Sequence, residues 1–156
     1  MATETERTHF VERMGGALTS AGLARLPSRI FSALLIDEDG RMTAAEIGAT
    51  LGVSPAAVSG AVRYLDGVGM VRRERERGSR RDIFVVDDDA WHDTLLKADQ
   101  IYAPMQTALR RALESLSPAD PAYRRLRLSH EFLIFMLEEL DSINERWDQR
   151  VRDLDL

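Results

Sequence analysis

The sequence contains no cysteine, and this absence excludes disulfide bonds, thiolate catalysis and redox sensing through thiols. It has no apolar run approaching the roughly 18 residues that a membrane-spanning helix needs, and its N-terminal residues do not resemble a signal peptide. We therefore expect a cytoplasmic protein. The net charge of −5 also excludes a protein that coats nucleic acid indiscriminately, because such a protein would be basic throughout.

A set of residues arranged for catalysis is also missing. The three histidines, His9, His92 and His130, are scattered, and none belongs to an HExxH zinc motif. The sequence has neither a glycine-rich dinucleotide fingerprint nor a Walker phosphate loop. The acidic run Asp87–Asp89 is compatible with a metal site, but carboxylates are also favourable at the start of a helix, and we favour this second interpretation. We predict a protein that is not an enzyme and that needs no metal or cofactor.

The most informative stretch begins as two short helices. Thr43 and Glu46 have the spacing of a capping box, in which each side chain bonds the other residue's backbone amide. Gly52 suits the left-handed position that ends a helix. Ser54 and Pro55 follow almost at once, and they are typical of the cap and first residue of a new helix. A join this short predicts a helix-turn-helix.

The second of these helices, residues 54–66, has two different faces. Val58, Val62 and Leu65 form an apolar stripe at helical spacing, which predicts packing against the first helix. The opposite face is made mostly of small residues: Ser54, Ala56, Ala57, Ser59, Gly60, Arg63 and Tyr64. Such a face can approach the major groove of DNA closely. The alternative is an ordinary solvated face of an amphipathic helix.

A strongly basic segment follows the second helix. Residues 72–81 contain six arginines and two glutamates, a local charge of +4 (6 − 2) on a chain whose net charge is −5. Gly78 and Ser79 supply a turn, and the β-branched and aromatic residues from Ile83 to Val86 predict a returning strand. Arginines on such a hairpin can contact phosphates or enter a narrow minor groove. The alternative is a solvated charge run in which arginine and glutamate pair across the strands.

Two parts of the sequence resemble a known family. Residues Leu51–Arg73 resemble the winged helix-turn-helix of MarR-type transcriptional regulators, and Phe10–Leu35 is similar to the GbsR-like branch of that superfamily. The resemblance implies a homodimer that binds double-stranded DNA, with helix 54–66 in the major groove and wing 72–82 on the backbone or in the minor groove. The contacts expected from the resemblance and from the outward helix face are Ser54, Ala56, Ser59, Arg63, Tyr64, Arg77, Arg80 and Arg81. The alternative function is a winged-helix protein–protein interaction module that does not bind DNA.

We expect a mainly α fold with a small β-hairpin wing. Residues 8–87 are predicted to form the winged helix-turn-helix domain. Arg41 and Met42 are expected to form a short third strand in it, and the polar residues 1–7 before it are expected to be frayed. Residues 88–152 are predicted to form a helical dimerisation region with helices over about 90–116 and 122–152. The last helix is too apolar to be covered by one small domain, which favours a homodimer. The first helix, residues 8–22, is a further candidate for the interface.

The resemblance also implies a small-molecule effector that binds between the dimer helices and the DNA-binding lobe. Some GbsR-like proteins respond to quaternary ammonium compounds. Trp91, Tyr102 and Trp147 are the candidate residues for an aromatic cage around such a cation. The alternative is that these three aromatic residues are ordinary core residues, which is the commoner role of aromatic residues at helical spacing.

Overall fold

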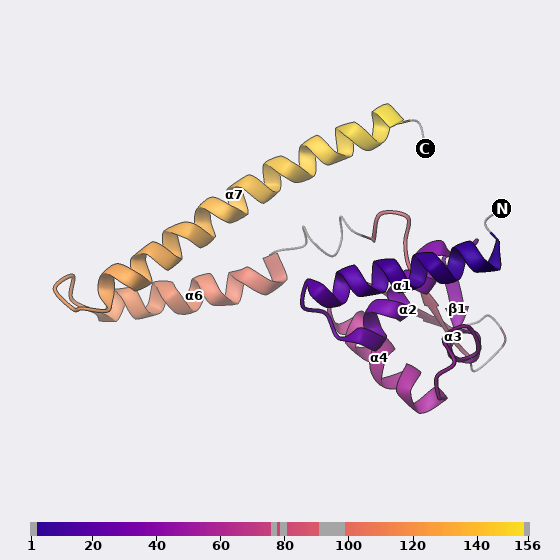
Figure 1. Ribbon diagram of the computed structural model, residues 1–156. Coiled ribbons are helices and arrows are strands. Elements are labelled where there is room, and N and C mark those ends of the chain that lie inside the picture. Colours follow the sequence, from indigo (N-terminus) through magenta and orange to yellow (C-terminus); the bar gives the residue numbers. More distant parts are fainter. Residues whose placement is uncertain (1–2, 76–77, 79–80, 91–98, 155–156) are drawn as a thin grey trace. The chain divides into compact units, whose positions relative to one another are not determined.

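The computed structural model describes residues 3–75, 78, 81–90 and 99–154, and it divides into two compact units, Met1–Thr94 and Leu95–Leu156. The elements, drawn in Figure 1, are α1 (Glu4–Ser20), α2 (Arg25–Ile36), β1 (Arg41–Thr43), α3 (Ala44–Leu51), α4 (Pro55–Gly67), β2 (Arg72–Arg75), β3 (Asp82–Val85), α6 (Asp99–Ser115) and α7 (Tyr123–Leu154). The predicted fold class, mainly α with a small wing, is confirmed. Among the described residues, no helix combines the length and the hydropathy that crossing a bilayer requires.

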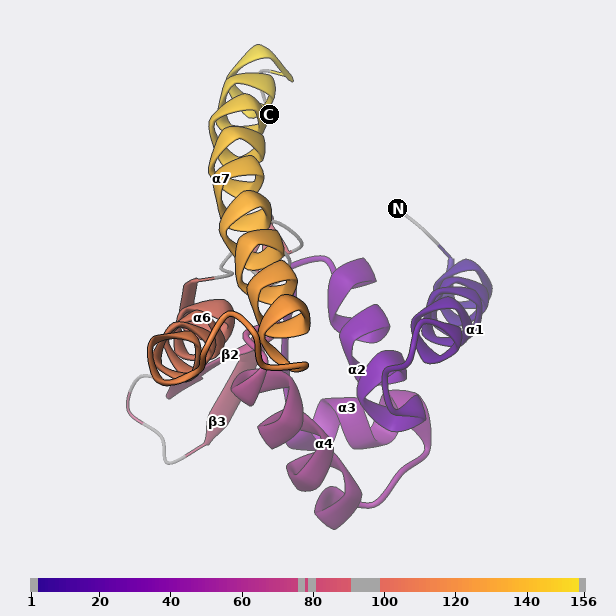
Figure 2. The same cartoon turned by 90° about the vertical axis from the view of Figure 1, so that its left-hand side faces the viewer.

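The sheet has three antiparallel strands in the order β1-β3-β2. Strands β2 and β3 form the wing hairpin (Figure 2). In its register Arg73 lies opposite Phe84, and Arg75 lies opposite Asp82. Gly78, at the tip, has a φ of 80°, a conformation that glycine adopts without strain. Strand β1 pairs with the other edge of β3 and confirms the predicted short third strand.

The helix-turn-helix forms as its local signals predict. The Thr43 amide donates to the Glu46 carboxylate at 2.7 Å, and the Glu46 amide donates to the Thr43 hydroxyl at 3.3 Å. Gly52 ends α3 with a φ of 66°, in the left-handed region. The Ser54 hydroxyl then accepts from the Ala57 amide at 3.3 Å, with Pro55 in the first turn of α4. Both helix ends at the turn are therefore fixed by short-range hydrogen bonds and by one glycine.

This capping box makes part of the stability depend on pH. The backbone amide and the hydroxyl of Thr43 lower the pKa of Glu46 below its ordinary value of 4.5. Because the folded-state pKa is lowered, the stabilisation is present above about pH 4.5 and is lost as the pH falls through the folded-state value. We expect Thr43→Ala to lower the free energy of unfolding by about 1 kcal/mol at neutral pH, and by less at acidic pH. Urea unfolding at several pH values tests this, and an equal loss at every pH would contradict it.

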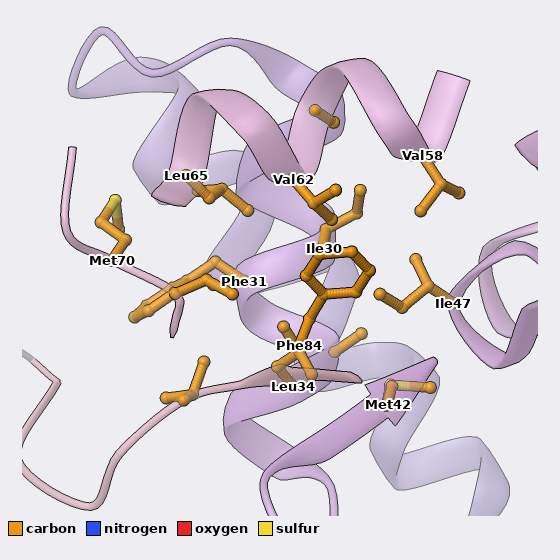
Figure 3. Close-up of a cluster of buried hydrophobic side chains, with 14 of the residues drawn as sticks. Ile30, Phe31, Leu34, Met42, Ile47, Val58, Val62, Leu65, Met70 and Phe84 are labelled. Atoms are coloured by element: carbon orange, nitrogen blue, oxygen red, sulfur yellow. The ribbon is translucent and has the colours of Figure 1, made fainter. Parts of the chain in front are cut away.

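A single core fixes the inner side of α4. Figure 3 shows Val58, Val62 and Leu65 pointing from α4 into one apolar cluster, whose other labelled members are Ile30, Phe31, Leu34, Met42, Ile47, Met70 and Phe84. Side chains of this kind each contribute about 1.5–3 kcal/mol when fully buried. The packing confirms the predicted apolar stripe, and it leaves the opposite face of α4 outside the core.

Helix α1 begins earlier than expected. Thr3 and Glu6 form a second capping box, so the expectation that residues 1–7 are frayed is wrong for the described residues 3–7. Arg7 strengthens this start, because it donates to the Glu38 carboxylate at 2.7 Å and to the Ile36 carbonyl at 3.1 Å. The threonine and glutamate have the same spacing as in α3, but the apolar periodicity begins only at Phe10.

The adjacent glycines of α1 have different surroundings. A Cβ added at Gly15 would lie 3.1 Å from Arg29 Cγ and 3.4 Å from Arg29 Cα, whereas one added at Gly16 would meet nothing within 4 Å. We expect Gly16→Ala to raise the free energy of unfolding by about 1 kcal/mol, the helix-propensity difference. Gly15→Ala should lose that gain to crowding against α2. Equal stabilisation of the two variants in urea unfolding would show that the α1–α2 contact does not require Gly15.

The second unit is a pair of helices, α6 and α7, that pack on each other. The predicted ends near residues 116 and 122 agree with the observed Ser115 and Tyr123, but most of the predicted start of α6, residues 91–98, lies outside the described residues. One side of α7 carries half-buried leucines at helical spacing: Leu126, Leu133, Leu137 and Leu140. The opposite side exposes Leu128, Phe132 and Phe135, which are 59%, 61% and 58% accessible. No described residue of α7 is fully buried.

Candidate nucleic-acid interface

The predicted helix contacts all lie on the exposed side of α4. Ser54, Ala56, Ser59 and Arg63 are exposed, and Tyr64 is 44% accessible. Gly60, on the same side, has open space around the position where a Cβ would be. The fold therefore does not require glycine there, although glycine inside a helix costs about 1 kcal/mol relative to alanine. Apart from Arg63 and Tyr64, this face has no long side chains.

The wing arginines divide into two groups. Two arginines of strand β2 are held by carboxylates of the same unit: Arg73 by Asp82, and Arg72 by Asp87 at 2.7 Å and also by Glu74. Arg41 of β1 reaches Glu74 as well, at 2.7 Å. Pairing of charges therefore describes Arg72 and Arg73, although the pair across β2 and β3 is with an aspartate, Asp82, and not with a glutamate.

These ion pairs also shift the pKa values of the residues that form them. The hydrogen bonds that Arg72 donates to Asp87 and Glu74 raise its pKa, and the hydrogen bond that Arg73 donates to Asp82 raises the pKa of Arg73. The bond with Arg73 in turn lowers the pKa of Asp82. Arg72 and Arg73 therefore carry little uncompensated charge, and they add little to the positive charge that the wing presents.

Of the three predicted wing contacts, only Arg81 is described, and it is exposed beside the start of β3. Arg77 and Arg80 lie outside the described residues. The charge of Arg81 adds to the lowering of the Glu46 pKa, after the hydrogen bonds from Thr43. Arg81 is thus close enough to the start of α3 for its charge to act there.

The acidic run after the wing has a role that the sequence did not reveal. The Asp87 carboxylate pairs with Arg72, and its carbonyl accepts from the Ala90 amide at 3.0 Å. The expected capping role of Asp87–Asp89 stays a prediction, because residues 91–98 lie outside the described part of the chain. The structure forms no group of three or more metal-ligating side chains among the residues it describes. Asp87 therefore helps to fix strand β2 at the end of the winged domain.

A hollow of ≈540 Å³ lies between the start of α3, one flank of α4 and the wing. The α4 flank contributes Pro55, Ser59, Val62, Arg63 and Asp66, whose spacing places them on one side of the helix. The other walls come from Thr43, Ala44, Ala45, Arg73, Arg81, Asp82 and Phe84. The hollow thus connects the two elements for which DNA contact is predicted.

Sequence reasoning identified Ser59, Arg63 and Arg81 but missed the acidic residues of this hollow. Asp66 stands three positions after Arg63, so its place on the same flank was readable from the helical period. The pairing of Arg73 with Asp82 could not be read in this way, because it depends on the register of β2 against β3.

The three candidate cage aromatics are only partly described. Tyr102 of α6 and Trp147 of α7 are half-buried. Trp91 lies outside the described residues, so the cage stays a prediction.

Comparisons with known proteins agree with this geometry. A MarR family model matches residues 21–82, and a model described as MmpR5-like MarR family transcriptional regulator matches residues 89–150. The chain belongs to the MarR family. This family and the relatives found consist of transcriptional regulators and not of enzymes. The GbsR-like branch stays a prediction, because neither matching model has that description.

Individual relatives match different shares of the chain. The HTH-type transcriptional regulator MmpR5 of Mycobacterium tuberculosis is 29% identical over 99% of this chain and 94% of its own length. The uncharacterized HTH-type transcriptional regulator YcgE of Bacillus subtilis is 36% identical over 41% of this chain and 42% of its own. A crystal structure of a transcriptional regulator superposes with a TM-score of 0.80 at 28% identity, covering 92% of this chain and 98% of that one.

Proposed function

We propose that this MarR-family protein is a homodimeric regulator that binds specific double-stranded DNA, with α4 in the major groove and the wing on the backbone or in the minor groove. The observation that carries the proposal is the exposed, mostly small-residue face of α4 beside an arginine-lined hollow and wing. A face without long side chains can reach the base edges, and arginines beside it supply phosphate contacts. Ser54, Ala56, Ser59, Arg63, Tyr64, Arg77, Arg80 and Arg81 are the proposed contacts.

The homodimer is supported by the outer side of α7. Leu128, Phe132 and Phe135 lie there on one side at helical spacing, and each is more than half accessible. Two phenylalanines and a leucine side by side are costly to leave in water, and the same patch on a second copy can cover them by two-fold symmetry. A two-fold axis would also present two recognition helices to two half-sites of one operator.

An effector that lowers DNA affinity is the third part of the proposal. A quaternary ammonium compound enclosed by Trp91, Tyr102 and Trp147 would have to bind the DNA-free conformation better, and linkage then weakens DNA binding by the same factor. The test is thermal unfolding and DNA release in the presence of choline and glycine betaine. If neither compound changes the melting temperature or the DNA affinity, this part of the proposal is wrong.

DNA binding itself is tested with the promoter DNA that flanks the protein's own gene, at several salt concentrations. We expect selective binding that weakens with salt, and weaker binding with a shallower salt slope for Arg80→Ala/Arg81→Ala. Arg110→Ala is the matched control, because Arg110 is an exposed arginine of α6 that pairs with Glu114. A protein that dimerises but binds no duplex at low salt would instead use α4 as a protein-docking surface.

A further inference from the structure

The hollow between α4 and the wing is lined partly by positively charged and partly by apolar side chains. Three arginines line it, and the rest of its surface includes the small or apolar side chains of Ala44, Ala45, Val62 and Phe84. A sugar–phosphate strand has the matching two kinds of surface, because its phosphates attract guanidinium groups and its deoxyribose rings are largely apolar. The hollow therefore fits a stretch of strand better than it fits an isolated anion.

The arginines of the hollow are not equivalent. Arg73 is held by Asp82. Within the described part of the chain Arg63 makes no ion pair, and its Nε donates to the Ser59 carbonyl at 3.2 Å, which leaves its terminal amino groups for a ligand. Arg81 stands across the hollow near the start of α3. A phosphate in the hollow can thus be reached by Arg63 from one side and by Arg81 from the other.

Asp66 is an unexpected member of this surface. Its carboxylate lines the same hollow, is exposed, and makes no ion pair with any residue that the structure describes. After the hydrogen bond to Asp82 and the charge of Asp82, the charge of Asp66 also contributes to the raised pKa of Arg73. With three arginines and two aspartates, the lining carries a formal charge of +1 (3 − 2). A carboxylate at this place repels any strand that lies at the Asp66 end of the hollow.

We propose that the hollow seats the DNA strand that separates the major groove from the minor groove, with Arg63 and Arg81 as its phosphate contacts. In this proposal Asp66 determines specificity, because it repels strands that lie in other registers. The inference rests on the proposed function. Non-specific complexes are held almost entirely by phosphates and sample many registers, so Asp66 weakens them more than it weakens the one aligned complex.

The test compares the duplex bound most tightly by the wild type with a random-sequence duplex of equal length. Arg63→Gln and Arg81→Gln should each make the salt slope shallower by about 0.9 per subunit, whereas Arg110→Gln should leave it unchanged. Asp66→Asn should tighten binding to the random duplex about five-fold at low salt, the size of one close like-charge repulsion in a solvated groove. Binding to the specific duplex should change by less than about two-fold, because the aligned strand avoids the Asp66 carboxylate. The ratio of specific to non-specific affinity therefore falls.

Failure of this inference can be told apart from failure of the proposed function. If the wild type binds no duplex, the proposed function is wrong and the inference with it. If the wild type binds selectively but Arg63→Gln and Arg81→Gln keep its salt slope, only the phosphate seat is wrong. Equal tightening of both duplexes by Asp66→Asn overturns the specificity role. If inorganic phosphate at constant ionic strength stabilises the wild type but not Arg81→Gln, and the slopes are unchanged, the hollow is a small-anion site.

Discussion

Replacing Phe132 and Phe135 together with aspartate is expected to convert the proposed dimer into a monomer. Each ring is more than half exposed on the outer side of α7, so a second copy would have to cover it. Burial of a phenylalanine contributes about 2 kcal/mol, and a two-fold interface contains each ring twice. Loss of four rings should therefore weaken self-association by about 6–8 kcal/mol, which corresponds to roughly 10⁴-fold or more in the dissociation constant.

Sedimentation over a wide concentration range measures this change, and urea unfolding of the winged unit checks that the chain still folds. Val68→Asp is the matched control, because Val68 is a 43% accessible apolar residue at the end of α4 in the other unit. A double variant that remains as dimeric as the wild type would mean that the outer side of α7 is not the interface. DNA affinity should fall together with dimerisation, since one half-site alone binds weakly.

Gly60→Gln is expected to weaken specific DNA binding while the fold becomes more stable. The added side chain meets no neighbouring atom, and glutamine is a better helix former than glycine by roughly 0.5–1 kcal/mol. On the exposed face of α4, however, the long side chain would hold the helix away from the base edges. We expect a loss of at least about ten-fold, or roughly 1.4 kcal/mol, in affinity for the specific duplex.

Gly60→Ala separates the two effects, because it gives the same gain in helix propensity without a long side chain. We expect its melting temperature to rise as in Gly60→Gln and its DNA affinity to stay near that of the wild type. Titration of both variants with specific and random duplexes is the measurement. If Gly60→Gln binds the specific duplex as well as the wild type does, the exposed face of α4 is not the surface that reads DNA.

The features that the sequence predicted correctly are those set by short-range chemistry. The capping box at Thr43, the left-handed Gly52 and the serine–proline start at Ser54 each depend on residues within a few positions, so the helix-turn-helix could be predicted residue by residue. The apolar stripe of α4 follows from periodicity in the same way, whereas the short strand at Arg41 was expected because such a strand often lies beside a wing.

The features that the sequence did not reveal depend on register and on tertiary neighbours. The pairing of Arg73 with Asp82 requires the alignment of two strands, and that of Arg72 with Asp87 joins residues 15 positions apart. The contact of Gly15 with Arg29 requires the packing of α1 on α2. Because the two members of such a pair neutralise each other's charge, a local count of six arginines overstated the positive charge that the wing presents.

Selection of duplexes from a random-sequence pool by the purified wild-type protein tests the central claim most directly. Two recognition helices related by a two-fold axis should enrich a palindromic site whose half-sites have centres roughly 34 Å apart, or about 10–10.5 base pairs. When the protein binds the enriched duplex, it should protect both half-sites from cleavage. No enrichment over the starting pool, or enrichment of a single half-site by a protein that is dimeric in solution, would contradict the account.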